Sequence, residues 1–501
     1  MKMISPLHQT ALNQPNAIAI KQASSSVGSL TYQQLSAMVC HLVNTLQTQG
    51  IKQHSRLACV SKNNLEMVCL YWACVDLGAV LLPISPRFPA QQINQLCQRF
   101  NIDAIWLEPS FMDDSSIKHN NKTDNNRVVN KLQLTISLSN TALAGAIPKI
   151  NPQQPLNIIL TSGSSGAPKA VVHCLENHIA SAVGSANNIA LAQGDSWLLS
   201  LPLFHIGGLA IINRCALAGA AVVLNDSQAL WQQIIASKVT HVSLVAAQLS
   251  KLLAQHPHAL DSVNALLLGG GAIEPHLVSA LADKQVNAYC SYGMSEMSSQ
   301  ITTAAINPQG HLGQVLLHRQ LNIVDNTIWV KGDCLFLGYL ADSDKNESSH
   351  AAITQASLTL PLDSQGWFNT QDRAMQDEKG NLYLLGRTDN MFICGGENIH
   401  PEEIEAALKS HPLVNDAVVF AQADPQFSLL PAAIIQLTDK HSPLTAKIIE
   451  SLQQHVLAKV ARFKRPRQYY SWPENVITTS LKVPRKAIVA AVKANLNEVN
   501  N

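Results

Sequence analysis

Apolar residues in the first hundred positions alternate between a helical period and short continuous runs. Residues 29–50 begin as the end of a strand and continue as a helix with apolar side chains at helical spacing, which Gly50 ends. Residues 55–63 carry a short apolar run typical of a buried strand, and residues 65–85 predict a helix followed by a strand. Strands that alternate with helices in this way indicate a mixed α/β fold in which helices cover the sheets.

The same alternation returns between residues 197 and 268, and the pattern changes near the C-terminus. Residues 113–131 and 341–357 are polar and are expected to form exposed loops. After Arg387 the predicted elements become short and follow a β-α-β order, which favours a smaller α+β domain. We therefore expect a large domain over residues 1–387 and a small mobile domain over residues 388–501.

Composition is that of a large globular protein. A chain of 501 residues is too long for one compact core, and 47% apolar with only 14% charged residues supplies a large interior. The net charge of +1 argues against an extended nucleic-acid surface or a polybasic membrane patch. Ten cysteines without a CxxC pair indicate neither a disulfide framework nor a zinc site, and Cys69 and Cys74 are expected as buried thiols.

Targeting signals are not apparent from the sequence. Residues 1–16 lack the apolar core of a signal peptide, and no apolar run reaches the length of a membrane span. We expect a cytoplasmic protein whose partners are small molecules rather than nucleic acid or membrane, with oligomers possible.

Residues 160–173, LTSGSSGAPKAVVH, place a loop rich in glycine and hydroxyl groups, with one lysine, between two apolar runs. Backbone N–H groups of such a loop can cradle an anion, and the hydroxyls and Lys169 add donors. A Walker A loop is excluded because Gly163 and Gly166 are too close and no Ser or Thr follows Lys169. The strand-like residues after the loop also supply no helix N-terminus. Taken alone, the loop is better explained as a plain surface turn than as a phosphate site.

Four motifs in order along the chain resemble those of the adenylate-forming superfamily of acyl-CoA synthetases, luciferases and adenylation domains. TSGSSGAPKA resembles the phosphate loop of that family, with Ala170 where glycine is usual, and SYGMSEMSS resembles its aromatic-Gly-x-Ser/Thr-Glu motif. GWFNTQDRA has Gln371 in place of a glycine, and residues 386–405 resemble the hinge and the loop that faces coenzyme A. The resemblance covers most of the chain. It implies the substrates ATP and CoA, with Mg²⁺ as cofactor.

The chemistry of these motifs suits a nucleotide. Glu296 is a hard oxygen ligand for Mg²⁺ on a triphosphate, or else a solvated loop carboxylate. Tyr292 offers an aromatic face to a purine, or packs in the core. Asp372 can accept hydrogen bonds from both ribose hydroxyls, and Arg387 can reach ribose or phosphate. The residues predicted to bind ATP are Thr161, Ser162, Gly163, Ser164, Ser165, Gly166, Lys169, Gly270, Gly271, Ala272, Tyr292, Gly293, Ser295, Asp372 and Arg387, with Glu296 for magnesium.

The resemblance also implies a two-step reaction and a lysine used in the first step only. Lys482 matches the family position that bridges the carboxylate and the α-phosphate, although Leu481 replaces the usual glycine; Lys486 is the alternative. A cation is needed there because the attack brings two anions together. The small domain is expected to rotate about a hinge near Asp389, and Gly395 and Gly396 to line the path of CoA.

The acid substrate is indicated by residues 200–217 and 266–277, which resemble the o-succinylbenzoate–CoA ligase branch of the superfamily, an activity of menaquinone biosynthesis. His205 occupies the position beside the acyl carboxylate, with Gly269 nearby, and is predicted to be catalytic together with Lys482 and Glu296. Arg214 is an isolated cation in an apolar helix, so either an internal carboxylate or a substrate carboxylate must meet it. An acid with a second carboxylate would supply that partner.

Other functions remain open at this stage. A medium-chain or aryl acyl-CoA synthetase would share every nucleotide motif. A stand-alone adenylation domain would need a carrier domain, for which no room is expected before Asn501. A non-catalytic nucleotide sensor would tolerate loss of Lys482. The near match of GMSEM to a hydrolase elbow lacks the last glycine, and a lipase would leave the phosphate loop unexplained.

Overall fold

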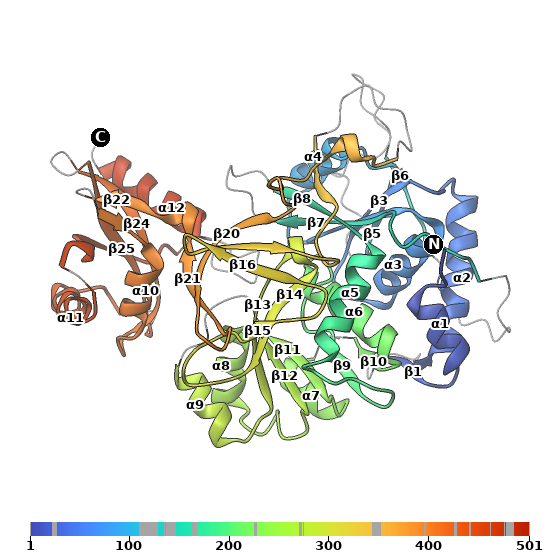
Figure 1. Cartoon of the computed structure of the whole chain (residues 1–501), viewed down its shortest axis with the longest axis horizontal. Coiled ribbons are helices and arrows are strands. Elements are labelled where there is room, and N and C mark those ends of the chain that lie inside the picture. The colour runs from blue at the N-terminus through green and yellow to red at the C-terminus, as the bar shows by residue number, and fades with distance from the viewer. Residues whose placement is uncertain are drawn as a thin grey trace. The chain divides into compact units, whose positions relative to one another are not determined.

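A computed structural model shows the protein as two compact units (Figure 1), which are described separately below. It describes residues 2–22, 28–109, 129–134, 136, 147–161, 168–224, 228–269, 273, 275–342, 352–394, 397–424, 428–439, 442–460, 462–474, 476 and 485–499. The first unit holds residues 1–320 and 330–368, and the second holds residues 321–329 and 369–501.

Two large sheets form the frame of the first unit. One has nine strands in the order β15-β14-β13-β12-β11-β9-β10-β1-β2. Its strands are β1 (Ile18–Lys21), β2 (Ser29–Thr31), β9 (Ser196–Leu198), β10 (Ala221–Val223), β11 (His241–Leu244), β12 (Ala265–Leu268), β13 (Ala288–Met294), β14 (Ser299–Ala305) and β15 (Gln314–Val315). Strands β9 to β13 pair in parallel, so the ends of β9, β11, β12 and β13 lead to one edge of the sheet.

The second large sheet has eight strands in the order β19-β18-β8-β7-β4-β3-β5-β6. Its strands are β3 (Arg56–Val60), β4 (Val80–Ile84), β5 (Ala104–Leu107), β6 (Asn130–Lys131), β7 (Pro155–Thr161), β8 (Lys169–Cys174), β18 (Gly338–Leu340) and β19 (Leu358–Thr359). Strands β7 and β8 pair antiparallel with Thr161 opposite Lys169, so the glycine-rich segment joins two neighbouring strands.

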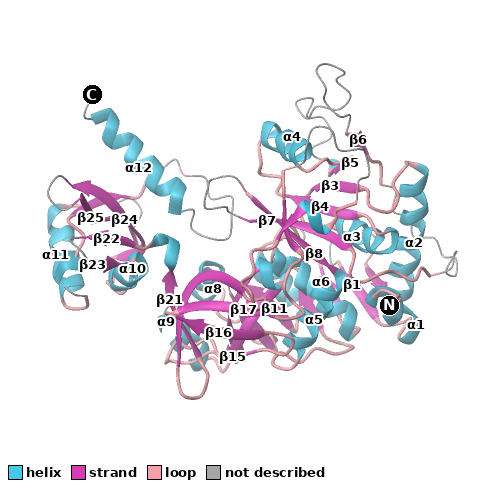
Figure 2. Cartoon of the chain, turned by 45° about the horizontal axis from the view of Figure 1, so that its top comes forward, coloured by secondary structure: helices cyan, strands magenta, loops and turns pink. Residues whose placement is uncertain are grey.

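Helices fill the space between the sheets and cover their outer faces (Figure 2). They are α1 (Pro6–Asn13), α2 (Tyr32–Thr48), α3 (Leu65–Leu77), α4 (Ala90–Arg99), α5 (Leu175–Ala186), α6 (Ile206–Ala218), α7 (Leu230–Ala236), α8 (Ala246–Gln255) and α9 (Pro275–Asp283). The largest apolar core joins α1, α2, α3, α5 and α6 to one face of each sheet. Helix α4 packs on the other face of the eight-stranded sheet, and α7, α8 and α9 pack on the other face of the nine-stranded sheet. The result is five alternating layers of helix and sheet.

The second unit contains a three-stranded sheet between helices. Strands β24 (Val414–Asp424), β25 (Ser428–Leu437) and β26 (Gln468–Ser471) form this sheet. Helices α10 (Pro401–Lys409) and α11 (Ala446–Leu457) share an apolar core with one face, and α12 (Arg485–Val499) packs on the other. A hairpin of β22 (Phe392–Cys394) and β23 (Glu397–Ile399) precedes α10. A four-stranded sheet, largely of this unit, comprises β16 (Gln320–Val324), β17 (Thr327–Lys331), β20 (Phe368–Gln376) and β21 (Leu382–Arg387).

The predicted elements are confirmed in most places. The helix expected before Gly50 is α2, the buried run at residues 55–63 contains β3, and residues 65–85 form α3 and β4. Residues 130–131, which were expected in a loop, form the exposed strand β6 beside β5; the rest of that polar stretch lies largely outside the described residues. The α/β fold class is confirmed, whereas the mobility of the C-terminal domain, its boundary at residue 387 and the hinge near Asp389 stay predictions.

Candidate active site

Predicted site residues of the first unit gather where parallel strands of the nine-stranded sheet end. His205 follows β9, Gly269 follows β12, and Ser295 and Glu296 follow β13. Ser291 of β13 donates from Oγ to the Leu268 carbonyl oxygen at 3.3 Å, which ties β13 to the end of β12 beside Gly269. Ligands of α/β sheets commonly bind at such carboxyl ends of strands. The fold therefore offers one edge at which an acid and a nucleotide can meet.

Lys169 and Glu296 are linked through an aromatic residue that the sequence did not single out. The Lys169 Nζ lies 4.9 Å from the ring centroid of Tyr339, a residue of β18. The Tyr339 hydroxyl donates to Oε1 of Glu296 at 2.7 Å. Because β18 pairs with β8, the sheet holds Tyr339 beside the strand that Lys169 begins. A cation and a carboxylate from two motifs thus contact one tyrosine side chain, the cation at its ring and the carboxylate at its hydroxyl.

Magnesium fits this arrangement as an ion bound mainly through phosphate. The Oε2 atom of Glu296 has no hydrogen-bond partner within the part of the chain that the structure describes, so it can serve as an oxygen ligand. That part of the chain contains no group of three or more His, Cys, Asp or Glu arranged to hold a metal. One carboxylate plus phosphate oxygens and water is a usual set of ligands for Mg²⁺.

His173 joins the strand after the glycine-rich segment to the turn that carries Glu296. Its ring is buried, and Nε2 donates to the Ser295 carbonyl oxygen at 2.7 Å. Burial lowers the pKa of His173 to about 4, against the opposing effect of the bond to Ser295, so the ring is neutral near pH 7. Its role was not predicted, because its partner lies 122 residues away along the chain.

The loop before α6 is held by Asn63. The Asn63 amide donates to the carbonyl oxygens of Leu199 and Leu201 and accepts from the backbone N–H of Leu203, at 2.9 to 3.0 Å. His205 then occupies the N-cap position of α6, with its ring 4.9 Å from that of Phe204. The half-buried His205 thus follows a loop whose backbone Asn63 holds in place, and its role beside the acid stays a prediction.

Arg214 lies in α6 and is 5% exposed. Its Nη2 donates to Oε1 of Gln300 at 2.7 Å and to Oγ of Ser299 at 3.4 Å, and its guanidinium lies 5.2 Å from the ring of Trp197. Its Nε is buried without a partner, and no carboxylate among the described residues forms an ion pair with it. Of the two partners predicted for this charge, the internal carboxylate is absent from the described part of the protein.

A second buried arginine reinforces the positive charge. Arg319 is held by the carbonyl oxygens of Leu317 and Ser181 and by the Ser181 hydroxyl, all neutral acceptors. Burial, and then the charge of Arg319, lower the pKa of Arg214 to about 9. Arginines elsewhere do find carboxylates, as Arg387 and Arg485 show. The region around Arg214 is therefore a buried cationic site that an anion would complete.

Predicted residues of the second unit pair with one another. Asp372 of β20 lies opposite Arg387 of β21, and Oδ1 of Asp372 accepts from Nη1 of Arg387 at 2.8 Å. Gln371 has a φ of 62°, in the left-handed region, which explains why glycine is usual there in the family that the motif resembles. Pro401 is the first residue of α10, with Glu402 and Glu403 in its first turn, as predicted.

The roles predicted for several other site residues stay predictions. Tyr292 is buried in β13 opposite Thr302, and its stacking on a purine stays a prediction; Thr161 and Gly293 are described at the ends of β7 and β13. The backbone of Asp389 forms a short 3₁₀ turn. The predicted residues outside the described part of the chain are Ser162, Gly163, Ser164, Ser165, Gly166, Gly270, Gly271, Ala272, Gly395, Gly396 and Lys482.

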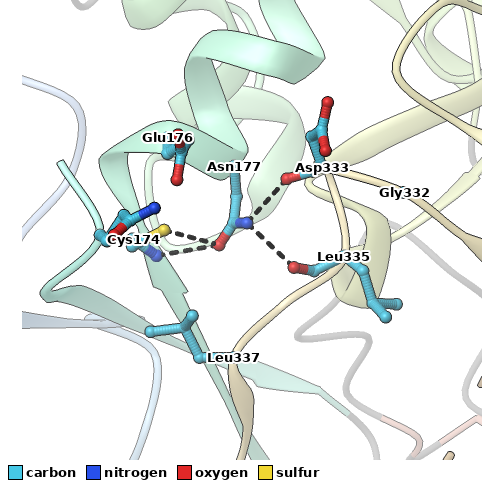
Figure 3. Close-up of a pocket in the computed structure, with 8 residues that line it drawn as sticks. Cys174, Glu176, Asn177, Gly332, Asp333, Leu335 and Leu337 are labelled. Carbon is cyan, nitrogen blue, oxygen red and sulfur yellow. Dashed lines mark hydrogen bonds between the residues drawn. The ribbon is translucent and has the colours of Figure 1, made fainter. Parts of the chain in front are cut away.

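A cavity of about 400 Å³ lies at the start of α5 and contains none of the predicted site residues (Figure 3). Asn177 projects across it and donates to the carbonyl oxygens of Asp333 and Leu335 at 2.8 and 2.9 Å. The backbone N–H of Cys174 donates to the amide oxygen of the same Asn177. These bonds fasten α5 to the segment before β18, so Asn177 has a structural role in this cavity.

Other features bear on the class of protein. All ten cysteines are free thiols, nine of them buried, among them Cys69 and Cys74 as predicted. In the described residues no helix is both long and apolar enough to cross a membrane.

Known proteins resemble this chain over nearly its whole length. The 2-succinylbenzoate–CoA ligase of Haemophilus influenzae is 33% identical over 475 residues, which cover 94% of each chain, and that of Escherichia coli is 29% identical over 92% of each. The o-succinylbenzoate CoA synthetase of Bacillus subtilis with its acyl-adenylate intermediate is a structural neighbour with a TM-score of 0.81 and 26% identity, over 97% of this chain and 98% of that one. The same enzyme with ATP and magnesium has a TM-score of 0.81 and 25% identity, over 98% and 100%.

Two family descriptions match the chain in the order that the motifs predict. Residues 7–340 match the AMP-binding enzyme family, and residues 403–482 match the C-terminal domain of AMP-binding enzymes. The first match alone spans more than half of the chain, and it contains the phosphate-loop segment, Glu296 and Arg214. The chain belongs to the AMP-binding enzyme family, as its motifs predicted.

Proposed function

We propose that this protein is an ATP-dependent acid–CoA ligase that converts o-succinylbenzoate, ATP and CoA to o-succinylbenzoyl-CoA, AMP and diphosphate. The structural observation that carries the choice of acid is Arg214, a buried cation without a carboxylate partner in the described residues. The relatives named above, which are ligases and synthetases of this acid, support the same choice. The product would serve menaquinone biosynthesis, in a cytoplasm that keeps the ten thiols reduced.

In the first step, a carboxylate oxygen of the acid attacks the α-phosphorus of ATP. A bond forms between that oxygen and phosphorus, and the bond to the bridging oxygen breaks as diphosphate leaves. Magnesium, when bound, supplies positive charge to the phosphates. We assign Lys169 and Glu296 to the phosphates and their metal, with Tyr339 holding both, and Lys482 to the charge that builds up between carboxylate and α-phosphate.

In the second step, the thiolate sulfur of CoA attacks the acyl carbon of the adenylate. A carbon–sulfur bond forms, the carbon–oxygen bond to phosphate breaks, and AMP leaves with the electron pair. Neither step needs a side-chain nucleophile, so the residues act by position and charge. We assign His205 to the acyl carboxylate and the entry of CoA, Asp389 to the hinge, and Gly395 and Gly396 to the CoA path.

Arg214 accounts for the second carboxylate of the acid. One carboxylate of o-succinylbenzoate, on the succinyl chain, is activated, and the other remains free on the aromatic ring. A free ring carboxylate beside Arg214 would accept hydrogen bonds from the planar guanidinium, whose donors match the two carboxylate oxygens. A fatty acid offers no such partner, and it would leave the charge of Arg214 buried and unpaired.

Purified protein incubated with ATP, Mg²⁺, CoA and a panel of acids tests this function. We expect AMP release with o-succinylbenzoate. With 3-benzoylpropionate, which lacks only the ring carboxylate, we expect AMP release to be slower by a factor of about ten or more. Omission of CoA should limit the reaction to acyl-adenylate and diphosphate. Equal turnover of both acids, or of medium-chain fatty acids, would assign the protein instead to general acyl-CoA synthetases, which share the nucleotide motifs.

A further inference from the structure

Gln300, the second residue of β14, fixes the position of the Arg214 guanidinium. Its Oε1 accepts from Nη2 of Arg214 at 2.7 Å and from Oγ of Ser185 at 2.8 Å, and its Nε2 donates to Oγ1 of Thr303 at 2.7 Å. Arginine has only donors, so the amide must present its oxygen to it. With 3% of the residue exposed, three hydrogen bonds hold the amide in one orientation.

The acceptor that Gln300 offers is neutral. A glutamate at this position would accept the same hydrogen bond and cancel the charge of Arg214, as Glu405 does for Arg485 at 2.5 Å in the second unit. The amide instead fixes the guanidinium and leaves its charge in place. The nearby Arg319, also held by neutral acceptors, adds to this charge rather than reducing it. Orientation without neutralisation is the requirement for a cation that must receive an anionic ligand.

The backbone before Gln300 is held in a rare conformation. Ser298 and Ser299 have φ values of 51° and 118°, both in the left-handed region. A Cβ on Gly293 would lie 2.1 Å from the Ser299 carbonyl oxygen, so this bend requires glycine on the neighbouring strand. The Ser181 hydroxyl donates to the Ser298 carbonyl oxygen at 2.6 Å and secures the bend. Strain of this kind persists where the surroundings enforce it, often at ligand sites.

We propose that Gln300 is a positioning residue for the acid substrate: it orients Arg214 toward a ligand carboxylate while preserving the charge that selects an acid with a second carboxylate. This inference rests on the proposed function. It predicts that the preference for a dicarboxylate depends on the neutrality of residue 300 and not only on the presence of Arg214.

The test is Gln300→Glu, which keeps size and acceptor and adds one negative charge. We expect the KM for o-succinylbenzoate to rise about tenfold or more, with a smaller change in kcat, because the new carboxylate competes with that of the substrate. The KM for 3-benzoylpropionate and the KM for ATP should change less than about twofold, since neither ligand depends on the charge of Arg214. A purely structural role would instead change the kinetics of both acids alike.

Gln314→Glu is the matched control, because Gln314 is exposed on β15 and pairs with Thr303 of β14. It adds the same charge to the same sheet and should leave the KM for o-succinylbenzoate and the KM for 3-benzoylpropionate unchanged. If Gln300→Glu does not fold, Gln300→Met removes the acceptor at similar size and should still raise the KM for o-succinylbenzoate alone. An unchanged preference between the two acids in whichever variant folds would overturn the role of Gln300, whereas a wild-type protein inactive on o-succinylbenzoate would overturn the proposed function itself.

Discussion

Arg214 brings a charged group into the interior of the first unit without a described carboxylate beside it. Arg214→Lys keeps the charge but loses the planar fork of hydrogen-bond donors. We therefore expect kcat/KM for o-succinylbenzoate to fall, by an amount that corresponds to a loss of about 2–5 kcal/mol in transition-state stabilisation, and the KM for ATP to stay unchanged. Steady-state kinetics with each substrate varied in turn would measure this. Turnover of 3-benzoylpropionate is the internal control, because that acid has no ring carboxylate to lose.

An equal loss with both acids, or a loss of folding in Arg214→Ala, would contradict the substrate role. Arg214 would then be a core residue that stabilises the packing of α6 against Trp197 and β14.

At the level of residues, sequence patterns reveal isolated chemistry but not its partners. Arg214 stands out because a lone cation interrupts an apolar helix, and Glu296 because it lies in a recognisable motif. Their partners Gln300 and Tyr339 have no such signal, since they lie 86 and 43 residues away along the chain and meet them only through tertiary packing: helix α6 packs against β14, and the turn after β13 meets a strand of the other large sheet. The absence of a carboxylate among the described acceptors of Arg214 is equally invisible in the sequence, because it depends on which acceptors fold inward.

Strand β8 connects the glycine-rich segment to the motif of Glu296 through His173, and this connection should make stability depend on pH. Burial lowers the pKa of His173 to about 4 from its ordinary value near 6.5, and the pKa of the adjacent buried His178 is lowered as well. The folded state thus resists protonation that the unfolded state accepts. The stabilisation is complete above about pH 6.5 and is lost as the pH falls toward 4, by about 3 kcal/mol for His173.

Denaturant unfolding at a series of pH values between 7 and 4.5 would measure this loss. His173→Gln should be less stable at pH 7 and show a shallower pH dependence. His258→Gln, which changes an exposed ring, should follow the wild type. Parallel curves for wild type and His173→Gln would contradict the assignment.

At the level of elements, local signals predicted most of the fold. Helix α2 begins at a capping box of Thr31 and Gln34 and shows clear apolar spacing, and α10 begins with Pro401 and two acidic residues. Strand β6 escaped prediction because two exposed residues in a polar stretch carry no apolar pattern, and only their pairing with β5 makes them a strand. The order of strands in the sheets is likewise set by long-range pairing.

At the level of the whole molecule, two compact units divide the candidate catalytic residues between them. Lys169, Glu296 and Arg214 belong to the first unit, whereas the range of the second unit includes position 482. The nearest described residue after that position is Arg485, which is fixed within the second unit. Its Nη2 lies 2.5 Å from Oε1 of Glu405, and its Nη1 donates to the Val419 carbonyl oxygen at 2.7 Å. Lys482 lies outside the described residues, but it precedes Arg485 by only three positions in the sequence, so we predict that it moves with the second unit. The predicted rotation of that unit would bring Lys482 to the acid or remove it.

Because only the first step joins two anions, Lys482→Ala should lose acid-dependent release of diphosphate by about a hundredfold or more. The same variant should still convert supplied o-succinylbenzoyl-adenylate and CoA to the thioester at nearly the wild-type rate, since no second anion needs to be neutralised then. Lys486→Ala is the matched control: Lys486 is exposed at the start of α12, and its loss should leave both steps intact. Equal loss of both steps in Lys482→Ala, or loss of the first step in Lys486→Ala, would move the adenylation charge away from Lys482 and remove the reason for a rotation between the steps.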